Sequence, residues 1–544
     1  MHIVTLLEFA SEKTIARLIV KERAKYRHRN NSMDNHTLDR DCDLGSLDLN
    51  KQLSRLSPPR YHWVWPRKRE KRNGVSDSRK NAIKAMMLTI KLNKAAERNE
   101  GKHFAYLDEL RAFRQRIIER LSDDNLLFES PNLSPRLKDK ELQDDGTFKV
   151  TCRPMSIYKK LEDKIILALT NMYLTRYFDS YLHENLLSYR KVKYDKVEKK
   201  AETIDFSEGA MRIKAFREKH DADTIYAADC DIKKFYDIIP HQTVRDCFQR
   251  MLDDHPSLSD EGKKQVMRVL NAYLNSYNFY DNVLRKVTDN PNIFDKVRGA
   301  LHDKGNKNTY VIGKVDKITD DEEYKRRGVP QGGALSLMIA NVVLNDVDKD
   351  IVGKPDDNRL FLRYCDDMIL MHTDRNECQR LIDMYAESLS RHGLVYHEFK
   401  RVSDSKATSD KYGTPAATGK DFWKIKSHSP FLWGQGEGDS NLYVGFLGYE
   451  IRRDGRIRLR KSNVEKIKEK FNRQRHIIMR YKENHSPEKC EEFRDKRLQS
   501  VLDGLLFYKA FDKDAFEHGS QYKYIVKLQE LTRRSVISNT SHYG

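Results

Sequence analysis

Two adjacent aspartates, Asp366 and Asp367, interrupt an apolar part of the chain. They lie in the stretch RYCDDMIL, which starts at Arg363 and continues into Ile369 and Leu370. Adjacent carboxylates in a half-buried strand repel each other and are costly to remove from water. A bound cation would offset most of this cost, and so would a tight reverse turn, where aspartate is common. The pair by itself is compatible with either explanation.

Further aspartates occur upstream in AADCDIKKFYDII, which contains Asp229, Asp231 and Asp237. In an extended strand Asp229 and Asp231 point to the same face, because side chains alternate. If this strand lies beside the aspartate pair, one of its carboxylates joins Asp366 and Asp367 around a common point. Three such carboxylates bind hard divalent cations through oxygen. Two Mg²⁺ ions about 4 Å apart stabilise the attacking and leaving oxygens of a phosphoryl displacement, so these residues predict phosphoryl transfer.

The stretch GVPQGGALS, between the two acidic regions, predicts a backbone that comes close to a ligand. Gly328, Gly332 and Gly333 leave room for such an approach, and Gln331 offers both a donor and an acceptor. A glycine-bearing loop that opens a helix is the plain structural alternative. The order of DIKKFY, GVPQGG and YCDD along one chain is much more specific than any one of these motifs.

The composition indicates a basic protein. The 544 residues include 101 Lys and Arg against 82 Asp and Glu, which gives a formal net charge of +19. Such a chain is attracted to polyanions, of which nucleic acid is the commonest, although lysine-rich faces also serve solubility. The seven cysteines are scattered and form no CxxC pair. This distribution is typical of a protein in the reduced cytosol, and it argues against a structural zinc site. No apolar run approaches the roughly 18 residues of a membrane span, and a basic leader is not evident. We therefore expect a cytoplasmic protein with no membrane partner.

Strands and helices must bring the candidate residues together. Residues 223–232 have the character of a strand, and residues 359–373 divide into two strands around the aspartate pair. The glycine-rich turn within 326–351 is expected to run into an apolar helix. The expected fold class is therefore α+β with a central sheet.

The later part of the chain predicts a hairpin and a helical tail. Asp454 and Gly455 supply the turn of the hairpin, and the run from Ser462 to Glu465 predicts a capping box that opens a long basic helix. Residues from about 402 to 440 are rich in Ser, Thr, Gly and Lys and are expected to form a loop.

Residues 1 to about 80 are expected to be irregular and basic. Within them RYHWVWPRKREKRNG, from Arg60 to Gly74, interleaves aromatic and cationic side chains. These residues could stack on RNA and neutralise its phosphates. They could equally form a solvated linker that is anchored by a pair of tryptophans.

Taken together, the motifs resemble those of a reverse transcriptase. DIKKFYD is similar to motif A of that family, GVPQGGALSLMIAN to motif B and YCDD to motif C. GLVYHEFK resembles motif D and FLGYEI the primer-grip hairpin of motif E, while CRPMSIYKKLEDKI and LLSYRKVK resemble the two fingers motifs. The resemblance covers roughly residues 150–460. In one departure, the usual SPLLAN of motif B reads SLMIAN at Ser336–Asn341.

The resemblance implies a role for each matching residue. Asp231, Asp366 and Asp367 would hold the metals, and the extra Asp229 is expected to be a supporting or structural group. Lys400 would neutralise or protonate the departing pyrophosphate, with an ordinary surface lysine as the alternative. Tyr236 matches an aromatic gate that clashes with a 2′-hydroxyl, with core packing as the alternative. The arginines of the fingers motifs could instead be salt-bridge partners. The implied nucleotide-binding residues are Tyr236, Gln331, Gly332, Arg153 and Arg190.

The resemblance also implies a right-hand polymerase fold, in which fingers and palm carry a central antiparallel sheet. A basic extension would occupy residues 1–80, and a helical region with the fingers residues 81–222. The palm would occupy residues 223–458, with insertions at about 245–325 and 402–440. A helical, thumb-like region would occupy residues 459–544.

Among reverse transcriptases, the chain looks like the bacterial defence-associated enzymes of the unknown-group and abortive-infection types. Those enzymes combine a polymerase core with helical additions, as FLGYEIRRDGRIRLRKSNVEKIKEKF suggests here. A tail with CxxC pairs, a VTG signature and an acidic RNase H-like module, which mark other classes, are not evident. The resemblance implies an antiphage role, a dedicated non-coding RNA and a homo-oligomer.

The expected activity is RNA-directed DNA synthesis with two Mg²⁺ ions, or Mn²⁺ in their place. The expected partners are an RNA template, a non-coding RNA, deoxynucleoside triphosphates and the DNA product. One alternative is a template-independent or protein-primed deoxynucleotidyl transferase on the same site, with Tyr522, Tyr524 and Tyr543 as candidate primers. The other is a non-catalytic RNA-binding scaffold.

Overall fold

The computed structural model divides into two compact units, each assembled from separate segments of the chain. Unit 1 comprises residues 1–182, 233–347 and 389–395, and unit 2 comprises residues 183–232, 348–388 and 396–544. The four regions expected from the sequence are not tested by this division and stay predictions. The structure describes residues 3–494 except 33–39, 68–70, 73–74, 77, 143–147, 191–192, 196–199, 203–205, 291–307, 312–314, 316, 319, 405–421, 435–438, 488 and 492.

Unit 1 begins with helices, so the expectation of an irregular segment over residues 1–80 is wrong. In α2, Ile15 and Ile19 are four residues apart and both are fully buried, as expected for one face of a helix. The many cations of this helix lower its average hydropathy and hide the apolar face in the sequence. The elements here are α1 (Leu6–Phe9), α2 (Glu12–Ser32), α3 (Arg40–Arg55), the 3-10 helix η1 (Arg60–His62), β1 (Lys71–Arg72) and β2 (Val75–Ser76).

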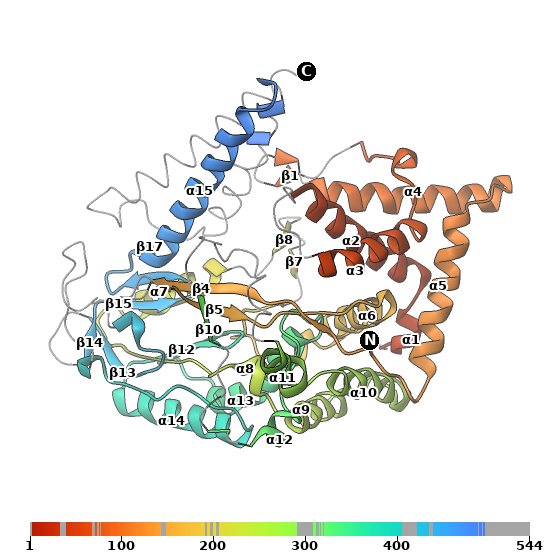
Figure 1. Ribbon diagram of the computed structural model, residues 1–544. Coiled ribbons are helices and arrows are strands. Elements are labelled where there is room, and N and C mark those ends of the chain that lie inside the picture. Colours follow the sequence, from red (N-terminus) through yellow and green to blue (C-terminus); the bar gives the residue numbers. More distant parts are fainter. Residues whose placement is uncertain are drawn as a thin grey trace. The chain divides into compact units, whose positions relative to one another are not determined.

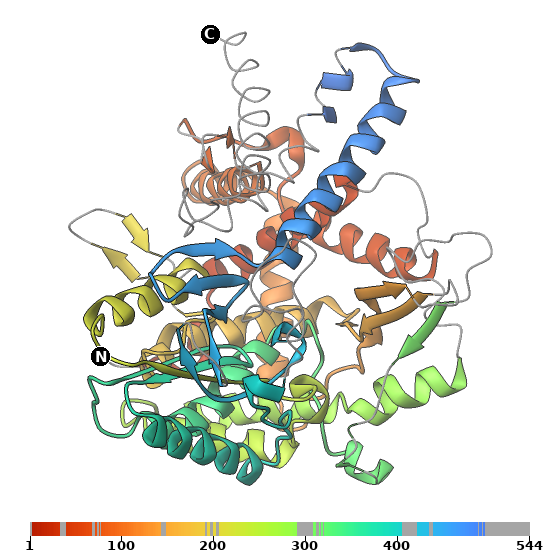
Figure 2. The ribbon, with the colours of Figure 1, turned by 90° about the vertical axis from the view of Figure 1, so that its left-hand side faces the viewer.

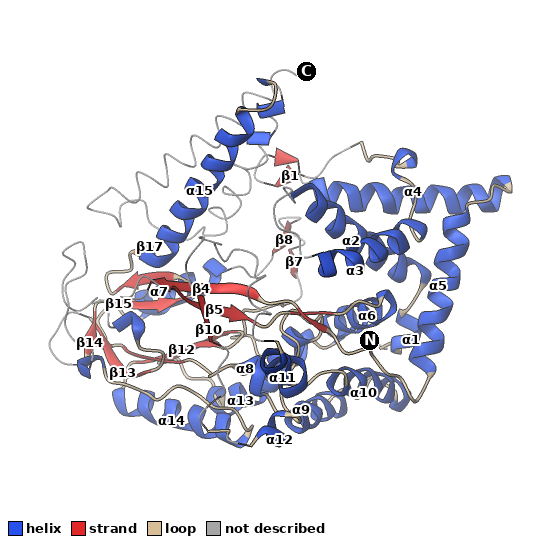
Figure 3. Cartoon of the chain, in the orientation of Figure 1, coloured by secondary structure: helices blue, strands red, loops and turns tan. Residues whose placement is uncertain are grey.

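The remainder of unit 1 combines helices with two small sheets (Figure 1; Figure 3). One sheet has the strand order β10-β5-β4 and the other pairs β3 with β6. The helices are α4 (Ser78–Glu100), α5 (Ala105–Ser122), α6 (Leu161–Tyr177), η2 (Asp179–Tyr181), α8 (Phe235–Ile238), α9 (His241–Asp253), α10 (Asp260–Asn275), the π-helix η3 (Tyr280–Leu284), α11 (Arg285–Asp289), α12 (Asp321–Tyr324) and α13 (Ser336–Val352), whose last turn belongs to unit 2. The strands are β3 (Asn132–Leu133), β4 (Arg136–Leu142), β5 (Phe148–Arg153), β6 (Ser156–Ile157) and β10 (Asn308–Val311).

Unit 2 is built on a five-stranded sheet in the order β11-β12-β9-β13-β14. Its neighbouring strands run antiparallel, except that β13 and β14 are parallel. The strand expected within 223–232 and the two strands expected around the aspartate pair are confirmed. The strands are β9 (Tyr226–Cys230), β11 (Arg359–Tyr364), β12 (Asp367–His372), β13 (His428–Trp433) and β14 (Ser440–Asn441).

The strand β13 lies inside the segment that was expected to be a loop, and this expectation is wrong. β13 pairs directly with β9 and so occupies an inner position of the sheet. Pro430 stands within it, and proline argues against a central strand because it cannot donate to the ladder. The structure accommodates this proline with a shift of register between His428 and Phe431, as expected for a β-bulge.

A second, three-stranded sheet follows, and its predicted turn is confirmed. Gly455 adopts a φ of +88° between β16 and β17. The capping box expected at Ser462–Glu465 is wrong, because α15 starts at Lys461 and its N-cap residue Arg460 makes no side-chain capping bond. Figure 2 shows this sheet leading into α15. The elements are β15 (Tyr443–Phe446), β16 (Tyr449–Arg452), β17 (Ile457–Leu459) and α15 (Lys461–Lys482).

The two faces of the central sheet pack against different elements. Leu362, Ile369 and Ala227 lie in one buried cluster with residues of the three-stranded sheet and of α7. On the opposite face, the ring of Phe361 packs 6.1 Å from that of Tyr385 in α14. The other elements of this unit are β7 (Lys193–Asp195), β8 (Lys200–Glu202), α7 (Phe206–Lys219), α14 (Arg375–Arg391, to Ser388 in this unit), η5 (Val402–Asp404) and η7 (Phe422–Lys424).

This mixture of helices and strands agrees with the expected α+β class. In the part of the chain that the structure describes, no helix has both the length and the apolar character required to cross a membrane. The end of the tail that was expected to be helical, including Tyr522, Tyr524 and Tyr543, lies outside the described residues.

Candidate active site

Asp231 and Asp367 come together through the register of two neighbouring strands. The pairing of β9 with β12 sets Cys230 opposite Met368, so the next residues on each strand are Asp231 and Asp367. Opposed residues of antiparallel strands have Cα atoms about 4.5–5.5 Å apart. Both aspartates share the face of Ala227 and Ile369, because alternate residues of a strand point the same way. The two carboxylates therefore meet at one end of the sheet.

Asp366 joins them through the tight turn between β11 and β12. Tyr364 pairs with Asp367, which leaves only Cys365 and Asp366 in the turn. Cys365 has a φ of +56°, an uncommon conformation for a residue other than glycine. Its N–H donates to the Ser188 hydroxyl over 3.1 Å, and its carbonyl accepts from Nη1 of Arg363 over 2.9 Å. The surrounding side chains thus hold the aspartate pair in a strained turn.

The electrostatics of the three aspartates favour a bound cation. Burial, followed by the negative charges of Asp366 and Asp231, raises the pKa of Asp367 to about 7. The positive charges of Arg460 and Lys426 oppose this shift but do not cancel it. Asp367 still reaches solvent at the surface of unit 2, so an ion has access to it. Three carboxylates with one open side are a fitting donor set for Mg²⁺.

The start of β13 supports the acidic cluster, and sequence reasoning missed this segment. The hydroxyl of Ser427 accepts a hydrogen bond of 3.0 Å from the N–H of Asp231, and Nζ of Lys426 lies 3.4 Å from the Asp231 carboxylate. The ring nitrogen Nδ1 of His428 lies 2.9 Å from both carboxylate oxygens of Asp229. Asp229 thus fastens β13 to β9. These contacts join residues nearly 200 positions apart, and no local spacing in the sequence marks them.

Lys400 also belongs to unit 2 and lies beside β13. Its N–H donates to the carbonyl of Ser427 over 3.1 Å, its carbonyl accepts from the N–H of Ser429, and its side chain is exposed. The structure therefore leaves the ammonium group at the surface, one strand away from Asp231. Its predicted role with pyrophosphate stays a prediction.

Arg190, the other predicted residue of unit 2, braces its own loop. Its Nη1 donates to the carbonyl of His183 over 2.6 Å and to that of Leu186 over 3.3 Å. The residue is only partly exposed. These hydrogen bonds to backbone carbonyls give Nη1 a structural role in the loop, and the predicted role of Arg190 with the triphosphate stays a prediction.

Tyr236, Gln331 and Gly332 come together within unit 1. The carbonyl of Tyr236 accepts a hydrogen bond of 2.8 Å from Val329, and Nε2 of Gln331 donates to the carboxylate of Asp237 over 2.9 Å. The backbone of Gln331 also bridges to the β5–β6 connection, since its carbonyl accepts from Ser156 over 2.8 Å. The loop that precedes α13 is thereby fastened to α8 on one side and to the β5–β6 connection on the other.

The glycines of this loop serve different physical purposes. Gly332 has a φ of +87°, which favours glycine. At Gly333 an added Cβ would lie 1.9 Å from the hydroxyl of Tyr273, so the close neighbour there is a protein side chain and not a ligand. Arg153, at the end of β5, is exposed and stands two residues before Met155, which bridges to Gln331.

The sequence of this chain matches a known family over more than half of its length. Residues 138–449 match the family described as "Reverse transcriptase (RNA-dependent DNA polymerase)". This chain belongs to that family. The match confirms the resemblance at the level of the family. No curated protein sequence matches the chain.

Solved structures of telomerase from Candida tropicalis are similar to this reverse transcriptase at low identity. The apo enzyme truncated from its C-terminal domain has 14% identity and a TM-score of 0.32, with 60% of this chain and 55% of that chain covered. The apo telomerase has 14% identity and a TM-score of 0.36, with 75% and 62% covered. The complex with a TWJ fragment of telomeric RNA has 12% identity and a TM-score of 0.37, with 85% and 74% covered. The chain thus spans less than two thirds of the length of the first two of these telomerase chains.

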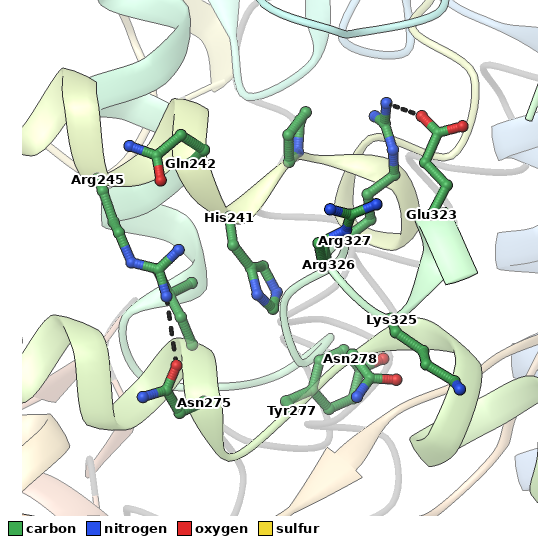
Figure 4. Close-up of a pocket in the computed structure, with 12 residues that line it drawn as sticks. His241, Gln242, Arg245, Asn275, Tyr277, Asn278, Glu323, Lys325, Arg326 and Arg327 are labelled. Carbon is green, nitrogen blue, oxygen red and sulfur yellow. Dashed lines mark hydrogen bonds and ion pairs between the residues drawn. The ribbon is translucent and has the colours of Figure 1, made fainter. Parts of the chain in front are cut away.

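Unit 1 of this reverse transcriptase also contains a cavity of about 740 Å³. Figure 4 shows His241 at its centre, with Arg245 on one side and Arg326 and Arg327 on the other. Burial lowers the pKa of His241 to about 4, and its Nε2 bonds to the carbonyl of Gly328 over 2.7 Å. None of the predicted site residues lines this cavity, so it is a separate feature of the unit.

A second group of possible ligand atoms occurs in unit 1 at Cys247, Asp346 and His392. Among the described residues it is the one group of three His, Cys, Asp or Glu side chains with ligand atoms all within 4.8 Å of one another. Arg250 already donates two hydrogen bonds, of 3.0 and 2.8 Å, to the Asp346 carboxylate. Because this guanidinium neutralises Asp346, the group does not need a metal. Asp231, Asp366 and Asp367 do not form such a close group, as expected for like charges that repel one another.

Proposed function

We propose that this chain is an RNA-directed DNA polymerase whose metals are held by Asp231, Asp366 and Asp367. The observation that carries the proposal is the pairing of β9 with β12, which directs Asp231 and Asp367 to one face beside the Asp366 turn. The family match supports the same chemistry. Asp231 and Asp367 extend from rigid strands, which is the arrangement needed for precise positioning of reacting groups.

The remaining residues would position the substrates. Gln331 and Gly332 would contact the incoming nucleotide or the template, in a loop that is already fastened on both sides. Arg153 and Arg190 would hold the triphosphate, for which the guanidinium fork is well suited. Lys400 would neutralise the leaving pyrophosphate. When bound, two Mg²⁺ ions would lower the pKa of the attacking hydroxyl and steady the triphosphate.

Tyr236 provides the sharpest test of nucleotide selection. Its ring is partly exposed and packs edge-on at 5.3 Å from Phe235, which supports a fixed wall at this position. We predict that Tyr236→Ala admits ribonucleotides, since a gate works by a steric clash with the 2′-hydroxyl. Competition between a deoxynucleoside and a ribonucleoside triphosphate on one primed template measures this selectivity. Tyr236→Phe is the matched control and should keep it. Unchanged selectivity in the alanine variant would remove the gate assignment.

The finer proposals follow from the family resemblance. The chain would adopt the right-hand polymerase arrangement, with α15 in the thumb-like region. It would work in the cytoplasm with a dedicated non-coding RNA, as a homo-oligomer in antiphage defence. The basic charge of the chain supports an RNA partner, and RNA binding should weaken steeply with salt.

Incorporation of labelled deoxynucleotides with Mg²⁺ separates the proposed function from its alternatives. The proposal requires synthesis that depends on an added RNA template. Synthesis that survives removal of all RNA and favours one base would identify a template-independent transferase. RNA binding without any incorporation would identify a scaffold. Attachment of the product DNA to the protein itself would show that a protein hydroxyl serves as the primer.

A further inference from the structure

Two aromatic side chains stand unusually exposed at the connection between α3 and α4. Tyr61 is 83% exposed and Trp65 is 42% exposed. Rings of this size carry a large apolar surface that folding normally removes from water. The exposure of two such rings four residues apart points to a binding surface.

The backbone that carries these rings is firmly anchored. Between them Trp63 is buried, its indole N–H donates to the carbonyl of Pro58 over 2.9 Å, and Arg23 lies over its ring at 5.8 Å. The next residue, Val64, donates its N–H to the Thr89 hydroxyl in α4 over 2.9 Å. The exposed rings therefore project from a fixed segment, so a ligand would not have to order it.

The end of α3 and the first part of this connection carry an excess of positive charge. Residues 49–67 include no Asp or Glu. Within the part of the chain that the structure describes, no ion pair neutralises the exposed cations of this segment. These cations are Lys51, Arg55, Arg60 and Arg67. Exposed aromatic rings among unpaired cations match a polyanion with flat faces, which is the chemistry of an unpaired nucleic acid strand.

We infer that Tyr61 and Trp65 form a stacking platform for single-stranded RNA, with Arg60 and Arg67 on the adjoining phosphates. This inference rests on the proposed function, which supplies an RNA partner. A single strand is favoured over a duplex because the base faces must be free to stack on the rings. The sequence allowed either an anchored linker or an RNA-binding segment, and the two interpretations are compatible. Trp63 anchors the segment, and Trp65 is exposed to solvent, where RNA could reach it.

Binding of a fluorescently labelled single-stranded RNA of 20 nucleotides, followed by anisotropy, tests the platform. The combined Tyr61→Ala and Trp65→Ala variant should bind at least tenfold more weakly, since each stacked base contributes about 1–3 kcal/mol. The matched Tyr61→Phe and Trp65→Phe variant keeps both aromatic faces and should stay within about threefold of the wild type. Leu127→Ala, at a 71% exposed apolar residue of unit 1, should have no effect.

Salt titration tests the part played by the arginines. Combined Arg60→Gln and Arg67→Gln should reduce the slope of log affinity against log salt by about 1.4, since each lost contact with a single strand contributes about 0.7. An unchanged slope would overturn the assignment of these two residues. Equal affinity for single-stranded DNA of the same sequence, or an equal loss of duplex binding in the alanine variant, would overturn the assignment to single-stranded RNA.

Two measurements keep this inference separate from the proposed function. Extension of a short, already annealed primer and template should persist in the alanine variant, because the rings are not part of the proposed polymerase machinery. A wild-type protein that fails to extend that primer would contradict the proposed function and leave the binding result standing. RNA affinity that is unchanged in the alanine variant, with the protein folded by circular dichroism, would overturn the platform itself.

Discussion

Two aspartates of unit 2, close to the same hairpin, have opposite electrostatic surroundings. Asp348 is 1% exposed and faces the fully buried Arg363, whose Nε lies 2.8 and 2.7 Å from the two carboxylate oxygens. Asp367, four residues after Arg363, has carboxylates as its strongest charged neighbours, and its pKa is raised to about 7. Asp348 has a buried counter-ion in direct contact, whereas the positive charges of Arg460 and Lys426 near Asp367 do not offset its carboxylate neighbours.

The difference shows how a fold separates structural from functional charge. A buried carboxylate that is paired and hydrogen-bonded can stay ionised inside a protein. Carboxylates gathered without an adequate partner must take up protons or bind a cation. The Arg363 side chain links the two cases, because it neutralises Asp348 and also holds the carbonyl of Cys365 in the aspartate turn.

Asp237 in unit 1 represents an intermediate case. It is 6% exposed, and its hydrogen-bond partner is the neutral amide of Gln331. Burial raises its pKa to about 6, with the Gln331 hydrogen bond opposing the shift. A neutral partner thus lowers the cost of burial without removing it.

The largest effect is expected from neutralising the aspartate pair. Combined Asp366→Asn and Asp367→Asn should reduce deoxynucleotide incorporation by roughly a thousandfold or more, because loss of metal-held charge costs several kcal/mol in the transition state. Thermal unfolding should occur at the same temperature or higher, since the change removes charges that repel one another. If the variant instead unfolds, the pair is structural and the contrast with Asp348 disappears.

The next largest effect, a loss of stability, is expected from breaking the buried ion pair between Arg363 and Asp348. Arg363→Met leaves Asp348 buried without its partner and should destabilise the protein by about 3–5 kcal/mol in denaturant unfolding. The double variant with Asp348→Leu is the control, and it should recover much of that loss because no charge remains buried. Synthesis should stay impaired in the double variant, since Cys365 still lacks its donor. Full activity there would show that Arg363 does not position the turn.

The smallest effect is expected from Asp237→Asn and depends on pH. The folded protein keeps the Asp237 proton up to a pH of about 6, whereas the unfolded chain releases it near 3.8. The wild type should therefore lose stability relative to the variant as pH rises from about 4 to 6, by no more than about 3 kcal/mol. Denaturant unfolding at pH 4.5 and pH 7.5 measures this difference. An equal stability difference at both pH values would show that ionisation of Asp237 does not destabilise the folded protein.

Sequence patterns predicted the acidic end of the central sheet because its determinants are local. The alternation of Asp229 and Asp231, and the apolar strands on both sides of Asp366 and Asp367, define strands and a turn without any distant contact. The family match then confirms that the chain belongs to the reverse transcriptase family. The roles of the individual residues stay predictions.

The rest of the site depended on contacts that no local pattern encodes. Pro430 and the polar residues before it made the sequence of β13 look like a loop. The hydrogen bond between the Ser427 hydroxyl and the N–H of Asp231 could therefore not be predicted. The N-terminal helices were missed because their cations outweigh a narrow apolar face. The pairing of Arg363 with Asp348 joins a strand and a helix 15 residues apart, and a sequence offers no reason to choose that carboxylate over its neighbours.

The most direct test of the account is anomalous diffraction from crystals of the protein with Mn²⁺, a primed RNA template and a non-hydrolysable deoxynucleoside triphosphate. We predict two Mn²⁺ peaks beside the carboxylates of Asp231, Asp366 and Asp367, and their loss in the Asp366→Asn, Asp367→Asn variant. Peaks elsewhere, for example at Cys247, Asp346 and His392, with none at the three aspartates, would contradict the central claim.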